Sequence, residues 1–142
     1  ADPSLSGYEQ SWTRLRNVVR WNVAGLAPSS GPTAQRILVL QKKAKRPIVN
    51  QEELVRHLAR SFPGVPVEES TMDLSAPEQL QLINTATVLI SPPGSLGFIA
   101  MFAPDGLAAI FVDSYLPSTR FTRGMDQFVF QHMPYLRVYQ HP

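Results

Sequence analysis

The 142-residue chain contains no cysteine. Disulfide frameworks, thiol nucleophiles and thiolate metal sites are therefore excluded from its fold and chemistry. The same absence slightly favours a reducing compartment, without excluding a secreted protein. No apolar run approaches the roughly 18 residues of a transmembrane helix, and we expect no signal peptide in the sequence because no basic-then-apolar leader opens it. Hydrophobic residues at 44% and charged residues at 17% are typical of one globular domain with its own core.

Positive charge is unevenly distributed. Lys42, Lys43, Lys45 and Arg46 form a basic cluster, whereas residues 61–119 contain no lysine or arginine. A short basic cluster can bind a phosphate, a membrane surface or nucleic acid, and it can equally be a solvated loop. Nucleic acid is not the expected partner, because no aromatic residues alternate with the basic ones and no basic stripe follows a helix.

The first 33 residues differ in character from the rest. Apolar residues such as Trp12, Leu15 and Val18 recur at steps of three and four from residue 6 to residue 24, with arginines between them, which predicts an amphipathic helix. A segment rich in proline, serine and glycine follows. We therefore divide the chain into an N-terminal helix and linker, residues 1–33, and a Rossmann-like domain, residues 34–142.

Apolar strand-like runs alternate with helix signals after residue 34, which predicts a parallel sheet with right-handed crossovers. Pro66 cannot donate a ladder hydrogen bond, so the second strand is expected at an edge, giving the order 2-1-3-4. The fold class is thus α/β, a three-layer Rossmann-like or flavodoxin-like sheet of four to five strands with helices on both faces. The expected strands are 36–41, 65–69, 87–90 and 107–112, with a last strand or an extended tail at 135–139 and a weaker helix at 125–131.

Two helix starts carry the same signature. Asn50 is followed three residues later by Glu53, and Ser75 by Glu78. Each pair predicts a capping box, in which the two side chains satisfy backbone amides at the helix start.

The central stretch, TVLISPPGSLGFIAMF from Thr87 to Phe102, reads as a buried strand, a tight turn and a helix capped by Ser95. Free amides at a helix start after a parallel strand can hold an anion such as a nucleotide diphosphate. On shape alone, an ordinary strand-to-helix turn explains the stretch equally well. Because parallel strands end at one edge, we expect the basic cluster, this turn and Asp113 to meet. The expected nucleotide-sugar site comprises Lys42, Arg46, Gly94, Ser95, Leu96, Gly97 and Asp113.

These segments resemble the carboxyl-terminal part of family 61 glycosyltransferases. The resemblance covers about residues 36–113 and is carried by the order and spacing of its motifs. The sequence departs from the family in the turn, where Pro93 replaces a histidine and Ser95-Leu96-Gly97 replaces Ala-Gly-Leu. The matching positions are Arg46, Asn50, Glu53, Ser75, Glu78, Gln79, Pro92, Gly94, Pro104, Gly106 and Asp113.

The resemblance implies one half of a GT-B-type fold that binds a nucleotide sugar as substrate, with no cofactor and no required metal. It implies that Gly94 faces the diphosphate, that Arg46 is a charge partner and that Asp113 contacts the ribose. It also implies an acceptor that is a glycan or a protein, a partner domain or chain that supplies the other half, and a location in the secretory pathway, the Golgi lumen or outside the cell. No residue is singled out as catalytic.

Two functions remain open. The chain is either the donor-binding part of a glycosyltransferase that transfers a sugar to an acceptor hydroxyl and is inactive alone, or a non-catalytic protein-interaction domain on the same scaffold. A third, weaker reading is another flavodoxin-like binding module such as a response regulator, but the chain is basic where that class has an acidic cluster. A Ser-His-Asp hydrolase is not expected, because the G-x-S-x-G elbow is absent.

Overall fold

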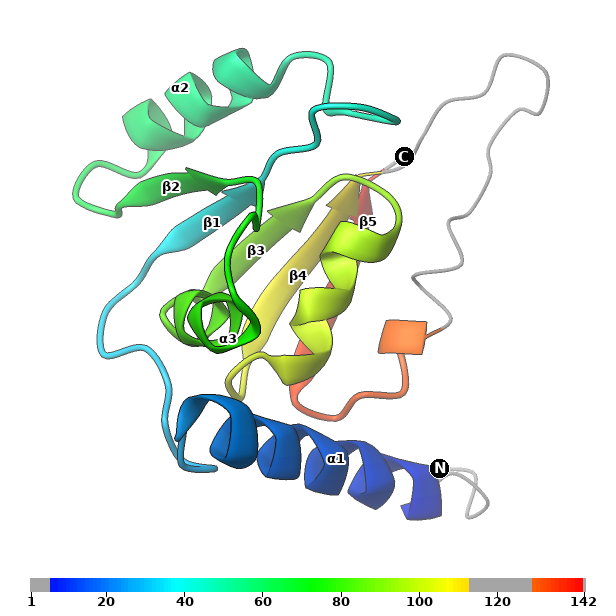
Figure 1. Ribbon diagram of the computed structural model, residues 1–142. Coiled ribbons are helices and arrows are strands. Elements are labelled where there is room, and N and C mark those ends of the chain that lie inside the picture. The colour runs from blue at the N-terminus through cyan, green and yellow to red at the C-terminus, as the bar shows by residue number, and fades with distance from the viewer. Residues whose placement is uncertain (1–5, 113–128, 142) are drawn as a thin grey trace, which may run out of the picture.

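The computed structural model describes residues 6–112 and 129–141. Five strands form one sheet in the order β2-β1-β3-β4-β5, and every neighbouring pair is parallel (Figure 1). The predicted α/β class, the edge position of the second strand and a fifth strand near the C-terminus are confirmed. The strands are β1 Ile37–Leu40, β2 Val67–Ser70, β3 Val88–Ser91, β4 Leu107–Val112 and β5 Leu136–His141.

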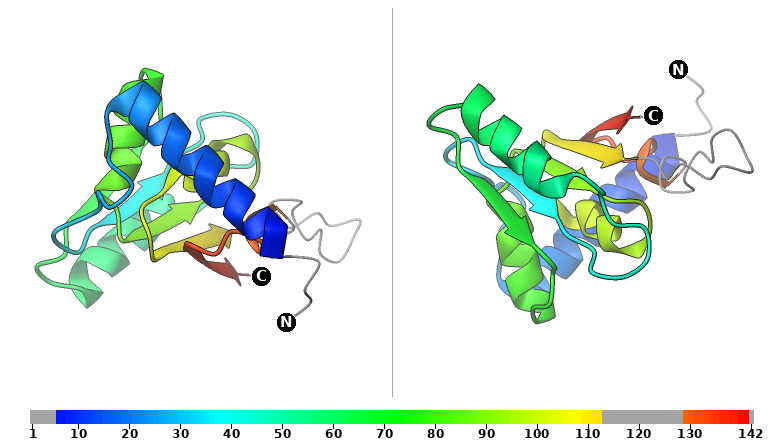
Figure 2. Two further views of the ribbon diagram at one scale, coloured as in Figure 1. Left: turned by 90° about the horizontal axis from the view of Figure 1, so that it is seen from below. Right: turned by 90° about the horizontal axis from the view of Figure 1, so that it is seen from above.

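Helices lie on both faces of the sheet. One face packs against α2, whose Leu54, Val55 and Leu58 contact a small core on β1 and β3. The larger core, on the other face, includes residues of α3 and of a 3-10 helix, η1, and is contacted by α1. The views from below and above in Figure 2 show α1 and α2 on opposite sides of the molecule. The helices are α1 Ser6–Ala24, α2 Gln51–Ser61, α3 Ala76–Asn84 and η1 Ser95–Phe102.

The central position of β1 follows from its sequence. All four of its residues, Ile37–Leu40, are apolar and buried, as a strand covered on both faces requires. Side chains alternate between the two cores, with Leu38 and Leu40 in the larger one and Ile37 and Val39 in the smaller. Burying each such side chain contributes about 1.5–3 kcal/mol.

The predicted helix at 125–131 lies largely outside the described residues.

The two predicted capping boxes have different outcomes. The Ser75 amide donates to Glu78 Oε2 at 2.9 Å, and the complete box is present at the start of α3, as predicted. Asn50 is the N-cap of α2, but its side chain makes no capping hydrogen bond, so the predicted box with Glu53 is wrong. The reason is conformational, because Asn50 has φ −107° and ψ 37° and lacks the extended backbone that directs an N-cap side chain at the next turn.

The capping box makes the stability of the fold depend on pH. Hydrogen bonds from the Ser75 hydroxyl and then from its backbone amide lower the pKa of Glu78 below 4.5. Because the folded pKa is depressed, this stabilisation is present above the ordinary glutamate pKa and is lost as the pH falls through the lowered value. We expect Glu78→Gln to lose less stability than wild type between pH 6 and pH 3, measured as urea midpoints. Glu52→Gln is the control, and equal losses in wild type and Glu78→Gln would contradict the prediction.

Helix α1 is amphipathic, but arginine residues lie on its buried face and several of its apolar residues are exposed to solvent. Arg16 and Arg20 are 3% and 0% exposed, whereas Leu15, Val18 and Trp21 are 45%, 57% and 61% exposed. Trp12 packs against the larger core, so the predicted apolar face is correct there and wrong farther along the helix.

The buried arginines bind carbonyl groups at the end of η1. Arg20 donates to the Phe102 carbonyl oxygen at 3.1 Å, and Arg16 to the Ala103 carbonyl oxygen at 3.3 Å. Arg16 also pairs with Asp105 at 2.5 Å. Burial, followed by the nearby Arg16 charge, lowers the pKa of Arg20. Arginine therefore occupies the buried face of α1, because this face packs against polar carbonyl groups.

The domain boundary at residue 33 stays a prediction.

Candidate functional site

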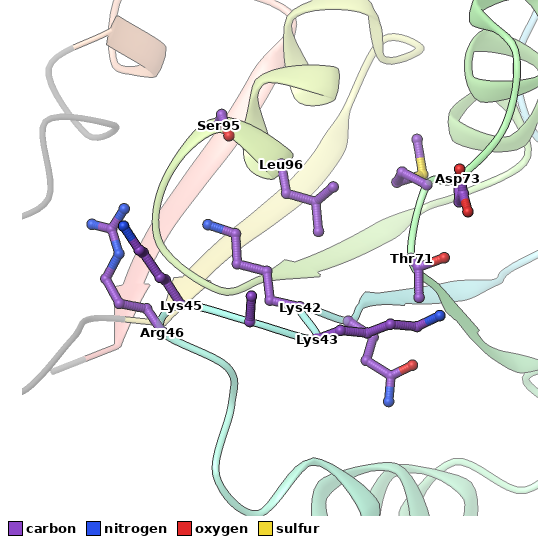
Figure 3. Close-up of a pocket in the computed structure, with 11 residues that line it drawn as sticks. Lys42, Lys43, Lys45, Arg46, Thr71, Asp73, Ser95 and Leu96 are labelled. Atoms are coloured by element: carbon purple, nitrogen blue, oxygen red, sulfur yellow. The ribbon is translucent and has the colours of Figure 1, made fainter.

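A cavity of about 680 Å³ opens at the carboxyl edge of the sheet (Figure 3). Its walls come from the three segments that follow β1, β2 and β3, which are neighbours in the sheet. Ligands of open parallel sheets bind at this edge, where the strand order reverses. The lining residues are Gln41, Lys42, Lys43, Ala44, Lys45, Arg46, Thr71, Met72, Asp73, Ser95 and Leu96.

The basic cluster after β1 meets the turn after β3. Lys42 Nζ donates to the Pro93 carbonyl oxygen at 2.6 Å, which links the two loops. A Cβ atom added at Gly94 would lie 2.9 Å from Lys42 Nζ and 3.0 Å from Arg46 Nη2. The structure therefore brings Lys42, Arg46 and Gly94 together, and the absence of a side chain at Gly94 makes room for both cations.

Two lining residues have a backbone conformation that L-residues rarely adopt. Arg46 has φ 57° and Met72 has φ 58°. A non-glycine residue held in this region costs about 1–3 kcal/mol and persists only where the surroundings enforce it, typically at functional sites. Both strained residues line the same cavity, one from the loop after β1 and the other from the loop after β2.

Helix η1 begins at the cavity. Its N-cap is Gly94, not Ser95 as predicted, and no side-chain capping bond is present. Gly94 takes this position because its φ of 104° is accessible to glycine. The first hydrogen bond joins the Gly97 amide to the Gly94 carbonyl oxygen at 3.0 Å. The amides of Ser95 and Leu96 therefore precede the bonded part of η1, at its positive end.

Gly94 adjoins the cavity without being one of its lining residues, and the other two predicted site residues lie elsewhere. Gly97 is buried, and a Cβ atom there would approach Phe111 Cε1 at 2.8 Å and Ser91 Oγ at 2.9 Å. The close contact at Gly97 is thus with strands β3 and β4, and Gly97 does not line the cavity. Asp113 lies outside the described residues.

The loop between β2 and α3 adds residues that the sequence analysis did not select. Thr71, Met72 and Asp73 form one side of the cavity. Lys43 and Lys45, which belong to the predicted basic cluster after β1 but were not among the expected site residues, add to its basic wall. The available signal was topological, because β2 ends at the same edge as β1 and β3. Asp73, an acid four residues beyond the strand expected at 65–69, could have been placed there.

The described residues 6–112 and 129–141 contain no group of three or more histidine, aspartate or glutamate side chains placed to hold a metal ion. None of the helices in these residues is long and apolar enough to cross a bilayer. The cavity instead offers ammonium and guanidinium groups, helix-start amides and one carboxylate. This set suits a ligand with an anionic part and hydroxyl groups.

Comparison with known proteins identifies the family of the chain. The model of the family described as glycosyltransferase 61 matches residues 3–110, and so includes α1. Two protein O-linked-mannose β-1,4-N-acetylglucosaminyltransferases 2 are similar, at 32% identity over 64% of the chain for that of Takifugu rubripes and 30% over 63% for that of Bos taurus. The matches span 15% and 16% of the lengths of these relatives. Because the family model covers well over half of its residues, the chain belongs to glycosyltransferase family 61.

Proposed function

We propose that the chain is the donor-binding part of a glycosyltransferase, with the diphosphate of a nucleotide sugar held in the cavity. The observation that carries the proposal is the convergence of Lys42 and Arg46 on Gly94 at the start of η1. The side chains of Lys42 and Arg46 and the amides of the first two residues of η1, Ser95 and Leu96, would then donate hydrogen bonds to the same anion. Charge-assisted bonds of this kind are the strong ones in phosphate sites.

The proposed reaction transfers the sugar from the nucleotide to an acceptor hydroxyl. Negative charge grows on the leaving diphosphate as the bond to the sugar breaks, and Lys42 and Arg46 would stabilise that charge. We propose that the acceptor is a glycan or protein, since the names of both relatives specify O-linked mannose on protein. We also propose that the reaction takes place in the secretory pathway, the location that the family resemblance implies. The chain would be one half of a GT-B-type enzyme, active only with a second domain or chain.

One observation favours the alternative of a protein-interaction domain. Leu15, Val18 and Trp21 leave an apolar stripe exposed on α1, as at an interface. Pro93 also removes the histidine that the family usually has in the turn. In this alternative the donor cavity would be a remnant, without affinity for nucleotides.

Calorimetric titration with UDP and GDP at low salt distinguishes the two functions. We expect binding by wild type and at least a tenfold loss in both Arg46→Ala and Arg46→Gly, because each removes the guanidinium group. Arg46→Gly also relieves the positive φ, so we expect its unfolding free energy to be unchanged or up to about 1 kcal/mol higher than that of wild type.

Arg56→Ala, on the exposed side of α2, is the charge-matched control and should keep wild-type affinity. Folding of each variant is checked by circular dichroism. A folded wild-type chain that binds neither nucleotide argues against the donor site and for the interaction domain. Equal affinities in wild type and both Arg46 variants would remove Arg46 from the site.

A further inference from the structure

We infer that Asp73 binds the ribose of the nucleotide, so that the donor lies across the cavity with its diphosphate at Gly94 and its nucleoside at the loop between β2 and α3. This inference rests on the proposed function and deepens it. It assigns a specificity-determining contact that discriminates ribonucleotides from 2′-deoxyribonucleotides.

The cavity has two chemically different ends. In Figure 3, Lys45, Arg46 and Ser95 lie on one side, while Thr71 and Asp73 lie on the other, together with the end of the Lys43 side chain. Leu96 lies between these two groups in Figure 3, and Met72 precedes Asp73 in the loop, so apolar side chains adjoin the Asp73 end. A phosphate group matches the first end, and a polar sugar with an adjoining flat base matches the second.

Asp73 is the one carboxylate among the described residues that line the cavity. Within residues 6–112 and 129–141 it makes no hydrogen bond or ion pair, although four basic side chains line the same cavity. A carboxylate in this cavity repels an anionic ligand, so its presence is explained if it binds another part of the same ligand. Since an ionised carboxylate only accepts hydrogen bonds, the vicinal hydroxyls of ribose are suitable donors.

The loop that carries Asp73 is fixed on both sides of this residue. The Gln79 carboxamide donates to the Met72 carbonyl oxygen at 3.0 Å and to the Leu74 carbonyl oxygen at 2.9 Å. The Met72 amide donates to Ser70 Oγ at 3.0 Å, and Met72 is held at positive φ. Gln79 is therefore a positioning residue, because it holds the segment around Asp73 before a ligand arrives.

The test compares UDP, 2′-deoxy-UDP and pyrophosphate by calorimetry. We expect wild type to bind UDP about tenfold more tightly than 2′-deoxy-UDP, in line with the loss of a hydrogen bond to a charged group. In Asp73→Asn, UDP affinity should fall by a similar factor and the difference between the two nucleotides should disappear. Pyrophosphate affinity should stay the same or rise, since the variant removes a negative charge next to an anion. Glu52→Gln, on α2, is the matched control and should behave as wild type.

Gln79→Met tests the positioning role. We expect it to reduce the preference for UDP over 2′-deoxy-UDP at least threefold while pyrophosphate binding is unchanged. A general loss of folding would instead weaken all three ligands together. Circular dichroism confirms that each variant is folded.

Three results would overturn the ribose assignment alone. They are unchanged or tighter UDP binding by Asp73→Asn, a preference for UDP over 2′-deoxy-UDP that survives in that variant, and weaker binding of UDP-N-acetylglucosamine without weaker binding of UDP. The last result would move the contact from the ribose to the transferred sugar. A wild-type chain that binds neither UDP nor pyrophosphate overturns the proposed function and this inference together.

Discussion

Replacing Arg20 by alanine is expected to lower the free energy of unfolding by about 3–5 kcal/mol. The side chain is fully buried, and its guanidinium group binds four acceptor atoms from three places in the fold. Each of these part-buried acceptors left unsatisfied costs up to about 1–3 kcal/mol, and the truncation adds a cavity. The acceptors are the Phe102 and Ser30 carbonyl oxygens, Ser30 Oγ and Asn84 Oδ1.

Urea unfolding followed by circular dichroism measures this effect. Arg14→Ala is the control, because Arg14 lies on the same helix, is exposed and should cost less than about 0.5 kcal/mol. Arg20→Lys retains the charge without the planar fork and should fall between wild type and Arg20→Ala. A loss below about 1 kcal/mol in Arg20→Ala would mean that α1 does not depend on these bonds.

In Gly94→Ala, nucleotide affinity is expected to fall at least 100-fold. The backbone of Gly94, at φ 104° and ψ −161°, lies in a region that is essentially restricted to glycine. The new Cβ atom would also come within 2.9 Å of Lys42 Nζ and 3.0 Å of Arg46 Nη2. Alanine must therefore strain or move the turn, and the ends of the Lys42 and Arg46 side chains must shift, so the geometry proposed for the diphosphate is disturbed. The backbone strain alone should lower stability by about 1–3 kcal/mol.

Gly64→Ala is the control that separates the effect of backbone strain on stability from the loss of the site geometry. Gly64 has φ 88°, and a Cβ atom there would meet nothing within 4 Å. We expect this variant to be destabilised comparably but to bind UDP as wild type does. If Gly94→Ala retains wild-type affinity in the calorimeter, the diphosphate does not lie at this turn.

Much of the fold was predictable because its signals are local. Pro66 placed β2 at an edge, apolar runs marked the central strands, and Ser75 with Glu78 marked the start of α3. The burial of α1 was not predictable in this way. Helical periodicity shows that two faces differ, but the buried face is set by its partner, which here is a group of carbonyl oxygens recognised by Arg16 and Arg20.

The candidate site was predictable to the extent that it follows from topology. The approach of Lys42 and Arg46 to Gly94 follows from β1 and β3 being neighbours in a parallel sheet. The positive φ of Arg46 and Met72 leaves no mark in the sequence, because neither residue type favours that conformation. The pinning of the Asp73 loop by Gln79 depends on packing between segments that periodicity does not describe.

The two ends of η1 are in electrically different surroundings. At its carboxyl end, the carbonyl oxygens of Phe102 and Ala103 receive hydrogen bonds from buried arginines, which neutralise the negative pole inside the protein. The positive pole at Gly94 faces the cavity next to Lys42. An approaching anion therefore meets a net positive pole instead of a balanced dipole, and a monopole field weakens more slowly with distance. At physiological salt its reach is limited to a Debye length of about 8 Å, so capture of an anionic ligand should slow as ionic strength rises.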